Sequence, residues 1–156
     1  MRTQELAVVS LQPDPSCPLG LDLKHILSAL GGKLRDWVWC LKDLDWLGEN
    51  GESLRDAVEA AGPGGLWIDS RDLLDIVAGI YQTIEGEFLA FPESIDRRDL
   101  GAPDLDLSSF PASRAVLAVV AVDGCSFDVY SKDPETTHLL QDTFPGARSE
   151  NLDHYF

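Results

Sequence analysis

The stretch from residue 114 to 132, RAVLAVVAVDGCSFDVYSK, constrains the fold more than any other part of the chain. An unbroken apolar run, Ala115–Val122, is followed by Asp123-Gly124 and then by a second run rich in β-forming residues. Asp-Gly between two such runs favours a two-residue turn, because a type I′ turn needs positive φ at both central residues. The sequence therefore predicts an antiparallel hairpin with three pairs on one face: Val122 with Cys125, Val120 with Phe127, and Ala118 with Val129.

The first strand of this hairpin is apolar on both faces, so we expect it near the centre of a sheet. Further strands are expected where apolar and polar residues alternate, or where short apolar runs stand between turn residues. These strands are residues 5–11, 34–41, 66–68 and 84–91. In the second of them, Trp37, Trp39 and Leu41 are expected to share a face.

Four helices are expected, and the first and last have clear start signals. Apolar residues recur at the spacing of one helical face from Leu23 to Leu30, Asp22 is a suitable N-cap, and Gly31-Gly32 follow the last turn. The last helix should begin at Asp133-Pro134, because Asp is a good cap and Pro suits the first helical position. Its buried face is expected to carry Leu139, Leu140 and Phe144.

The two middle helices are short. One is predicted over residues 54–61, with a capping box made by Ser53 and Asp56. The other is predicted to start at the cap Ser70 and to share one face among Leu73, Leu74, Val77 and Tyr81. Two acidic stretches, 43–52 and 92–113, are interpreted as loops. Together these elements predict a single α+β domain over residues 1–156, with a mainly antiparallel sheet and three to four helices packed on it.

The charge of the chain limits its partners. Twelve Lys and Arg stand against 27 Asp and Glu, so the formal net charge is -15 at pH 7. Nucleic-acid binding needs a basic footprint, and the basic residues here are scattered. Anionic membrane surfaces are disfavoured for the same reason. The negative field favours a basic protein partner, although acidic surfaces also serve simply to keep proteins dispersed.

The cysteines indicate a reducing compartment. Cys17, Cys40 and Cys125 are odd in number and widely spaced, which argues against a disulfide framework. Cys40 and Cys125 lie in apolar strand patterns and are expected in the core. The first residues lack the long apolar stretch of a signal peptide, and the run Ala115–Val122 is too short to span a bilayer. We therefore expect a cytoplasmic protein.

No motif for catalysis, a cofactor or a metal is recognisable. Asp43-x-Asp45 resembles the start of a calcium loop, but Leu47 and Leu54 stand where that loop needs oxygen ligands. A nucleophile–histidine–acid set has no local signature and could assemble only in space, for example from Ser126 with His138. We therefore assign no catalytic, cofactor or metal residue, and we favour a protein that is not an enzyme.

A recognition surface is the remaining candidate. Trp46 lies within an acidic segment whose charged residues include Asp43, Asp45, Glu49 and Glu52. An aromatic anchor with a rim of carboxylates suits a basic protein, because the ring supplies buried area and the acids speed and orient docking. These five residues are the predicted partner-binding residues. If Trp46 instead folds into the core, the acids are only a solvated surface.

Three stretches of the chain resemble small bacterial α+β domains, including some immunity-type proteins of toxin systems. They are ILSALGGKLRDWVWCL, LWIDSRDLLDIVAGIYQTIEGEFLAF, and the apolar strand and turn that run into FDVYSKDPE. The likeness lies in structural patterns that together span most of the chain. The resemblance implies a toxin-immunity function, and it transfers no binding residue.

The favoured hypothesis is an acidic protein-binding domain, one form of which is an immunity protein that neutralises a basic toxin or enzyme by occluding it. Two alternatives stay open. The first is a small-molecule-binding or hydrolytic enzyme domain, which a deep pocket with converging His or carboxylate groups would favour. The second is a homodimeric structural subunit, which an exposed sheet edge or apolar patch would favour.

Overall fold

A computed structural model of the chain describes residues 7–13, 21–49, 51–122 and 126–151. These residues form one seven-stranded sheet, all antiparallel, in the order β3-β2-β4-β5-β6-β1-β7. The strands are β1 (Ala7–Leu11), β2 (Trp37–Gly48), β3 (Leu66–Asp69), β4 (Ile80–Pro92), β5 (Leu117–Val122), β6 (Ser126–Ser131) and β7 (Arg148–Asn151). The α-helices are α1 (Leu23–Leu30), α2 (Gly51–Ala61), α3 (Ser70–Val77) and α4 (Pro134–Thr143). The 3-10 segments are η1 (Gly31–Asp36), η2 (Gly62–Gly64), η3 (Arg97–Asp99), η4 (Ala102–Leu105) and η5 (Leu107–Ala112). The predicted α+β class, with its mainly antiparallel sheet, is confirmed.

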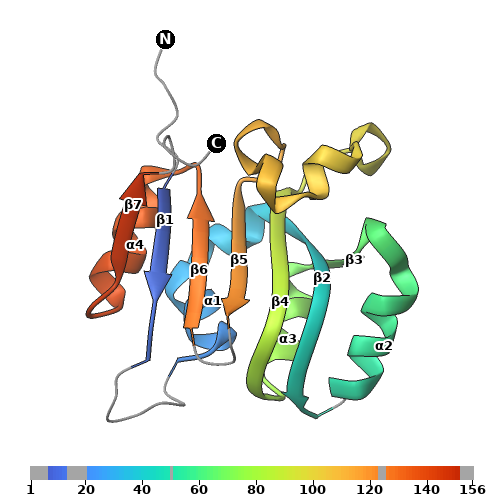
Figure 1. Cartoon of the computed structure of the whole chain (residues 1–156), viewed down its shortest axis with the longest axis horizontal. Helices are drawn as coiled ribbons and strands as arrows, with labels where there is room; N and C mark the ends of the chain where they lie inside the picture. Colours follow the sequence, from blue (N-terminus) through green and yellow to red (C-terminus); the bar gives the residue numbers. More distant parts are fainter. Residues whose placement is uncertain (1–6, 14–20, 50, 123–125, 152–156) are drawn as a thin grey trace.

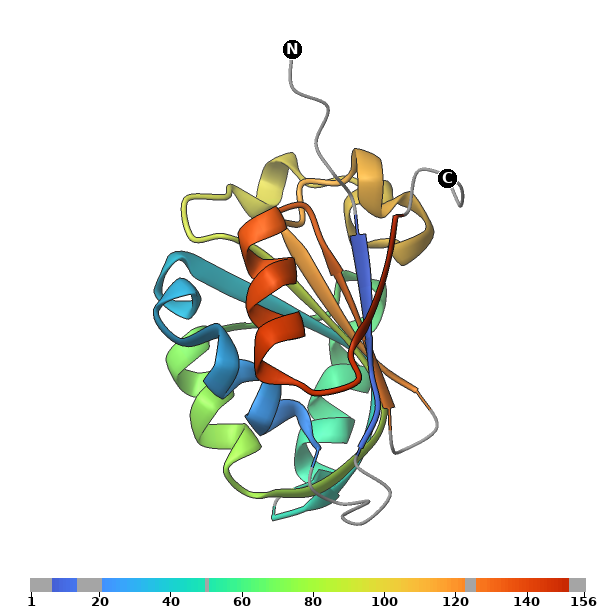
Figure 2. The same cartoon turned by 90° about the vertical axis from the view of Figure 1, so that its left-hand side faces the viewer.

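Helices α1, α3 and α4 lie on one face of the sheet, which we call the helical face (Figure 1 and Figure 2). The main core lies between these layers and includes Trp39 of β2, Phe88 of β4 and Phe127 of β6, all fully buried. Helix α2 instead packs along the outer edge of β2, beside the short strand β3 (Figure 1). The opposite face of the sheet therefore needs a different cover.

Residues 93–115 provide that cover at one end of the opposite face (Figure 1). Phe110 is 1% exposed and packs with Cys40, Phe91 and their neighbours in a second core cluster. The ammonium group of Lys42 donates to the backbone oxygen of Leu105 at 2.8 Å, which ties the segment to β2. The interpretation of 92–113 as an exposed loop is therefore wrong in part: residues 93–113 form no α-helix or strand and many are exposed, but they contain three 3-10 segments and bury Phe110. Cys40, by contrast, is in the core as predicted, whereas Cys17 and Cys125 lie outside the described residues.

The central hairpin forms with a register one residue away from the predicted one. Val122 pairs with Ser126, and Val120 pairs with Asp128. The predicted turn residues, Asp123-Gly124, lie outside the described residues. Because β5 is apolar at every position, a one-residue slip leaves an apolar side chain on each face, and its pattern could not distinguish the two registers. The prediction that this strand is central is confirmed, since three strands lie on each side of β5.

The predicted starts of α1 and α4 are confirmed. The Asp22 carboxylate accepts from the backbone N–H of Leu23 at 2.6 Å, and the Asp133 carboxylate accepts from that of Glu135 at 3.1 Å. Leu140 of α4 is buried, whereas Leu139 and the C-cap residue Phe144 are half-buried.

The two middle helices start differently from the prediction. Ser53 lies inside α2, which begins at Gly51, so it is not a cap. The N-cap of α3 is Asp69, which leaves the Ser70 hydroxyl free for other bonds. Leu73 and Val77 are buried, but Leu74 and Tyr81 are exposed, because α3 ends at Val77 and Tyr81 belongs to β4.

Candidate functional site

The structure separates the five predicted partner-binding residues. Trp46 is 5% exposed and lies in the main core, where its ring packs beneath Gly51 at the start of α2. It is therefore not an exposed anchor. The four acidic residues remain at the surface, two on β2, one between β2 and α2, and one on α2: Asp43, Asp45, Glu49 and Glu52.

The acidic segment is not a loop over its first half, because β2 continues to Gly48. Strand β3 pairs with β2 only as far as Leu41, so beyond that residue β2 has no second strand partner among the described strands. Asp43 has a φ of 52° and lies where the pairing register with β4 shifts, between Lys42 and Asp45. Helix α2 packs along this edge of β2, and the charges and the bulge further oppose pairing of the edge with another chain. The charges of Asp43 and Asp45 therefore have a structural explanation that does not require a partner.

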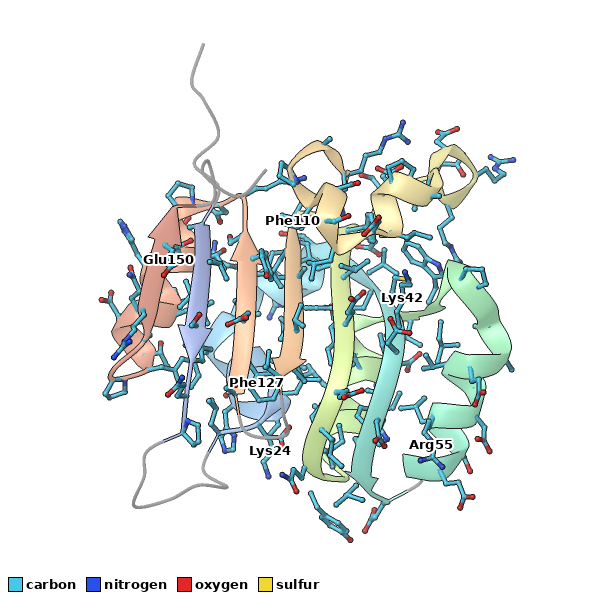
Figure 3. The ribbon with its side chains drawn as sticks, viewed as in Figure 1. Lys24, Lys42, Arg55, Phe110, Phe127 and Glu150 are labelled. Carbon is cyan, nitrogen blue, oxygen red and sulfur yellow. The ribbon has the colours of Figure 1, made fainter. Side chains whose placement is uncertain are left out.

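A first groove lies between β2 and α2, with Lys42 and Arg55 on its two walls (Figure 3). Its volume is about 440 Å³, and its charged lining consists of Lys42, Arg55, Asp43 and Glu59. Arg55 also reaches Asp45, with 3.7 Å between the guanidinium nitrogen and the carboxylate oxygen. Positive and negative groups balance here, so this groove does not select a basic partner.

A second groove, the α2–α3 groove, has a different lining. It lies where α2 faces the end of α3, and its volume is about 510 Å³. Leu54, Ala57 and Ile76 make it apolar, and Glu49 and Asp75 are its charged residues. None of the described residues that line it is basic. An apolar hollow with carboxylates and no cation is suited to an apolar side chain flanked by positive charge.

Two exposed hydrophobic residues are close in sequence to residues that line this groove. Leu47 is 54% exposed and precedes Glu49 by two residues on β2; Tyr81 is 70% exposed and follows Gly79 by two residues on β4. Glu49 and Gly79 themselves line the groove and are joined by a backbone hydrogen bond of 2.8 Å. Leu47 alternates along β2 with the core residue Trp46, so its side chain points to the face opposite the helical face, and neither Leu47 nor Tyr81 lines the groove.

Close backbone packing determines the shape of the groove. A Cβ atom at Gly48 would collide with the backbone oxygen of Gly79 and lie 2.8 Å from the Cα of Ile80. Glycine at position 48 lets β2 and the turn before β4 approach each other, which brings Glu49 to the end of α3. The lining residues come from segments up to about thirty positions apart, so no local sequence motif could predict the groove.

The structure does not bring Ser126 and His138 together as a catalytic pair. Ser126 lies on the face opposite the helical face, because it pairs with Val122 and alternates with the core residue Phe127. His138 is an exposed residue of α4, on the helical side of the sheet. Within the described ranges, no group of three or more His, Cys, Asp or Glu residues is arranged to hold a metal ion. Nor does any described helix have the length and apolarity needed to cross a membrane.

Fold and groove together define a class: an antiparallel α+β domain of strongly negative charge, with a carboxylate-bearing apolar groove between two of its helices. A scan against protein-family models, a search of curated proteins and a search of solved structures each found no match to the chain.

Proposed function

We propose that this chain is an acidic protein-binding domain that docks a basic protein on the α2–α3 groove. The observation that carries the proposal is the groove itself, which has an apolar lining, two carboxylates and no lining cation among the described residues. A protein segment with a large apolar side chain between Lys or Arg residues fits this chemistry. The apolar side chain fills the hollow, and the cations face Glu49 and Asp75.

The charge of the whole chain acts over a longer distance than the groove. A formal charge of -15 attracts a basic partner from solution and speeds its association, while the two groove carboxylates orient it on arrival. The same field opposes self-association through this surface, since two copies would bring their carboxylates together. A basic partner is therefore favoured over a homodimer at the groove.

One form of this function is that of an immunity protein, which neutralises a basic toxin or enzyme by covering its working surface. The resemblance of three stretches of the chain to immunity-type domains supports this form. It requires only a stoichiometric complex, with no chemistry on the part of this chain.

The test is a two-dimensional NMR titration with a synthetic peptide that carries Trp and Leu flanked by Lys and Arg. We expect saturable shifts at residues of the α2–α3 groove, and affinity about tenfold weaker at high salt than at low salt. Glu49→Lys with Asp75→Lys should abolish binding, because both carboxylates that line the groove are then replaced by cations. Glu49 and Asp75 are exposed residues outside the main core, so the fold should tolerate the two changes.

The matched control is Glu135→Lys with Asp142→Lys on α4, which makes the same charge change on exposed residues away from the groove. It should weaken binding by no more than about twofold, through the loss of long-range attraction. Equal loss in the control and groove variants would mean that charge alone draws the peptide, and the docking site would be wrong. An uncharged Gln analogue that binds as tightly as the basic peptide would also refute the proposal.

A further inference from the structure

A third groove, which we call the arginine groove, lies where β2 begins and α3 starts. Its volume is about 640 Å³. It is built from four separate parts of the chain: η1, the first residues of β2, the β3–α3 junction, and the segment after β4. Its lining includes Arg35, Trp37, Arg71, Leu74, Glu93 and Arg97.

Three guanidinium groups line this groove in a chain that has only twelve Lys and Arg. The side chains of Arg35 and Arg71 make no ion pair or hydrogen bond within the described part of the chain. The Arg97 guanidinium carbon lies 5.3 Å from the ring centroid of Trp67, a contact that leaves its N–H donors available. Unpaired cations in so acidic a protein are unexpected, because carboxylates are abundant.

The acidic residues of the lining do not cancel this positive charge. Asp69 is committed to the start of α3, where its carboxylate accepts from the backbone N–H of Asp72 at 2.7 Å. Glu93 is exposed at the groove. Three guanidinium groups and two carboxylates leave the lining with one net positive charge. The positive end of α3 adds to the attraction for an anion.

The rest of the lining is apolar. Trp37 is half-buried, with its ring edge-on to Trp39 at 6.0 Å between centroids. Leu74, Val38 and Ile95 add aliphatic surface, and Leu74 is one of the few large hydrophobic residues left exposed. The groove therefore offers guanidinium groups beside an aromatic and aliphatic wall, a combination that suits an anion attached to an apolar body.

Hydrogen bonds hold the walls of the groove in place without a ligand. The Ser70 hydroxyl donates to the backbone oxygen of Leu34 at 2.6 Å, and it accepts from the indole nitrogen of Trp39 at 2.8 Å. The backbone N–H of Glu93 donates to the oxygen of Asp36 at 2.7 Å. These bonds join α3, η1, β2 and the segment after β4, so a ligand would meet a preformed site.

We infer that the arginine groove binds a small monocarboxylic acid with an aromatic or branched apolar body. The single net positive charge of the lining matches one carboxylate, whereas a phosphate dianion would face Glu93 and the negative field of the whole chain. Guanidinium groups bind carboxylates through paired N–H donors, and Trp37 with Leu74 supplies the surface for the apolar body. This site does not depend on the proposed protein docking, since it has no lining residue in common with the α2–α3 groove.

The test uses NMR titration and calorimetry with phenylacetate, indole-3-acetate and 3-methylbutanoate as probes. Phenylacetamide is the neutral analogue, and inorganic phosphate is the competing anion. We expect saturable binding of at least one acid, with shifts at Trp37 and Arg71, and at least tenfold weaker binding of the amide and of phosphate. Arg35→Gln with Arg71→Gln should weaken binding of that acid at least tenfold, and Arg71→Lys should weaken it less.

The control is Lys24→Gln with Arg148→Gln, which removes two positive charges from exposed residues outside the groove. It should leave the affinity within about twofold of the original. The inference is overturned if none of the three acids binds saturably at concentrations up to about 10 mM. It is also overturned if the amide or phosphate binds as tightly, or if both double variants behave alike. None of these results bears on the peptide titration.

Discussion

Gly65 should be the least replaceable residue of the turn that joins α2 to β3. Its φ of 73° and ψ of 170° place it in a region that is essentially restricted to glycine. A Cβ atom at this position would also collide with the Sγ of Cys40 and lie 3.1 Å from the backbone oxygen of Leu41. Gly65→Ala therefore introduces backbone strain and overpacking together.

Gly62, in the same turn, separates the two contributions. Its φ is 71°, but a Cβ atom there would have no neighbour within 4 Å among the described residues. Gly62→Ala should lower the free energy of unfolding by about 1 kcal/mol, the cost of a left-handed backbone for a residue with a side chain. Gly65→Ala should lower it by about 4 kcal/mol, of which about half is strain and half is overpacking against Cys40.

Urea unfolding followed by tryptophan fluorescence measures these differences. Cys40→Ala removes the atom that Gly65→Ala would strike, so the double variant should recover about 2 kcal/mol relative to the sum of the single changes. Two results would contradict these expected differences in stability. One is a Gly65→Ala variant within about 0.5 kcal/mol of Gly62→Ala; the other is simple additivity between Gly65→Ala and Cys40→Ala.

Three further predictions concern buried polar groups. Burial raises the pKa of the Cys40 thiol from 9.0 to about 12, so the unfolded thiol ionises first as pH rises. The free energy of unfolding should then fall between pH 9 and 12 by about 1.4 kcal/mol per pH unit, a slope that Cys40→Ala removes in alkaline urea titrations. Asp22→Ala should lower the free energy of unfolding, measured in urea, by about 3 kcal/mol. The Asp22 carboxylate accepts from both the hydroxyl (2.7 Å) and the backbone N–H (3.1 Å) of Thr83, and both bonds are lost. A loss smaller than that for an ordinary exposed cap would contradict this prediction. Trp46→Phe should lower the free energy of unfolding by at least about 1 kcal/mol less than Trp39→Phe does. The Trp46 indole N–H has no acceptor among the described residues, whereas the Trp39 indole N–H donates to Ser70. Equal losses in the two variants would contradict this prediction.

The parts of the fold that could be predicted from the sequence are those determined by local signals. The helix Leu23–Leu30 has both an apolar face and a cap, and each signal indicates the same boundary. Strand β5 has six apolar residues in succession, which is enough to place it at the centre of the sheet. The pairing register between β5 and β6, however, depends on the connection between the two strands. Because β5 is apolar on both faces, its hydrophobic pattern does not distinguish one register from the next.

The second half of β2 could not be predicted because its local signals indicate a loop. Asp43 and Asp45 have low β-propensity, and the segment is a strand only because β4, some forty residues later, pairs with it. The burial of Trp46 follows from the same pairing, since Thr83 lies opposite it. Likewise, Arg35, Arg71 and Arg97 are about thirty residues apart in sequence, and only the packing of η1, α3 and η3 brings them to one groove.

The charges of α3 unite the two proposed sites. Arg71 lies in the first turn of α3 and Asp75 in the last, yet a helix dipole favours acids at its start and cations at its end. Each residue is therefore placed against the dipole, and each lines one of the grooves to which a function is proposed. Local rules that are broken at the surface of a helix, with no compensating ion pair, are typical of functional positions.

This placement makes a prediction that separates stability from binding. Arg71→Gln and Asp75→Asn should each raise the free energy of unfolding by about 0.3–1 kcal/mol at low salt, because each removes an unfavourable interaction with the dipole. In the same variants, the carboxylate probe should bind more weakly to the first and the basic peptide more weakly to the second. Asp72→Asn is the matched control, since Asp72 lies in the first turn, where an acid is favourable, and its loss should lower stability. If Arg71→Gln and Asp75→Asn were destabilising, the two charges would serve the fold, and their positions would give no support to either site.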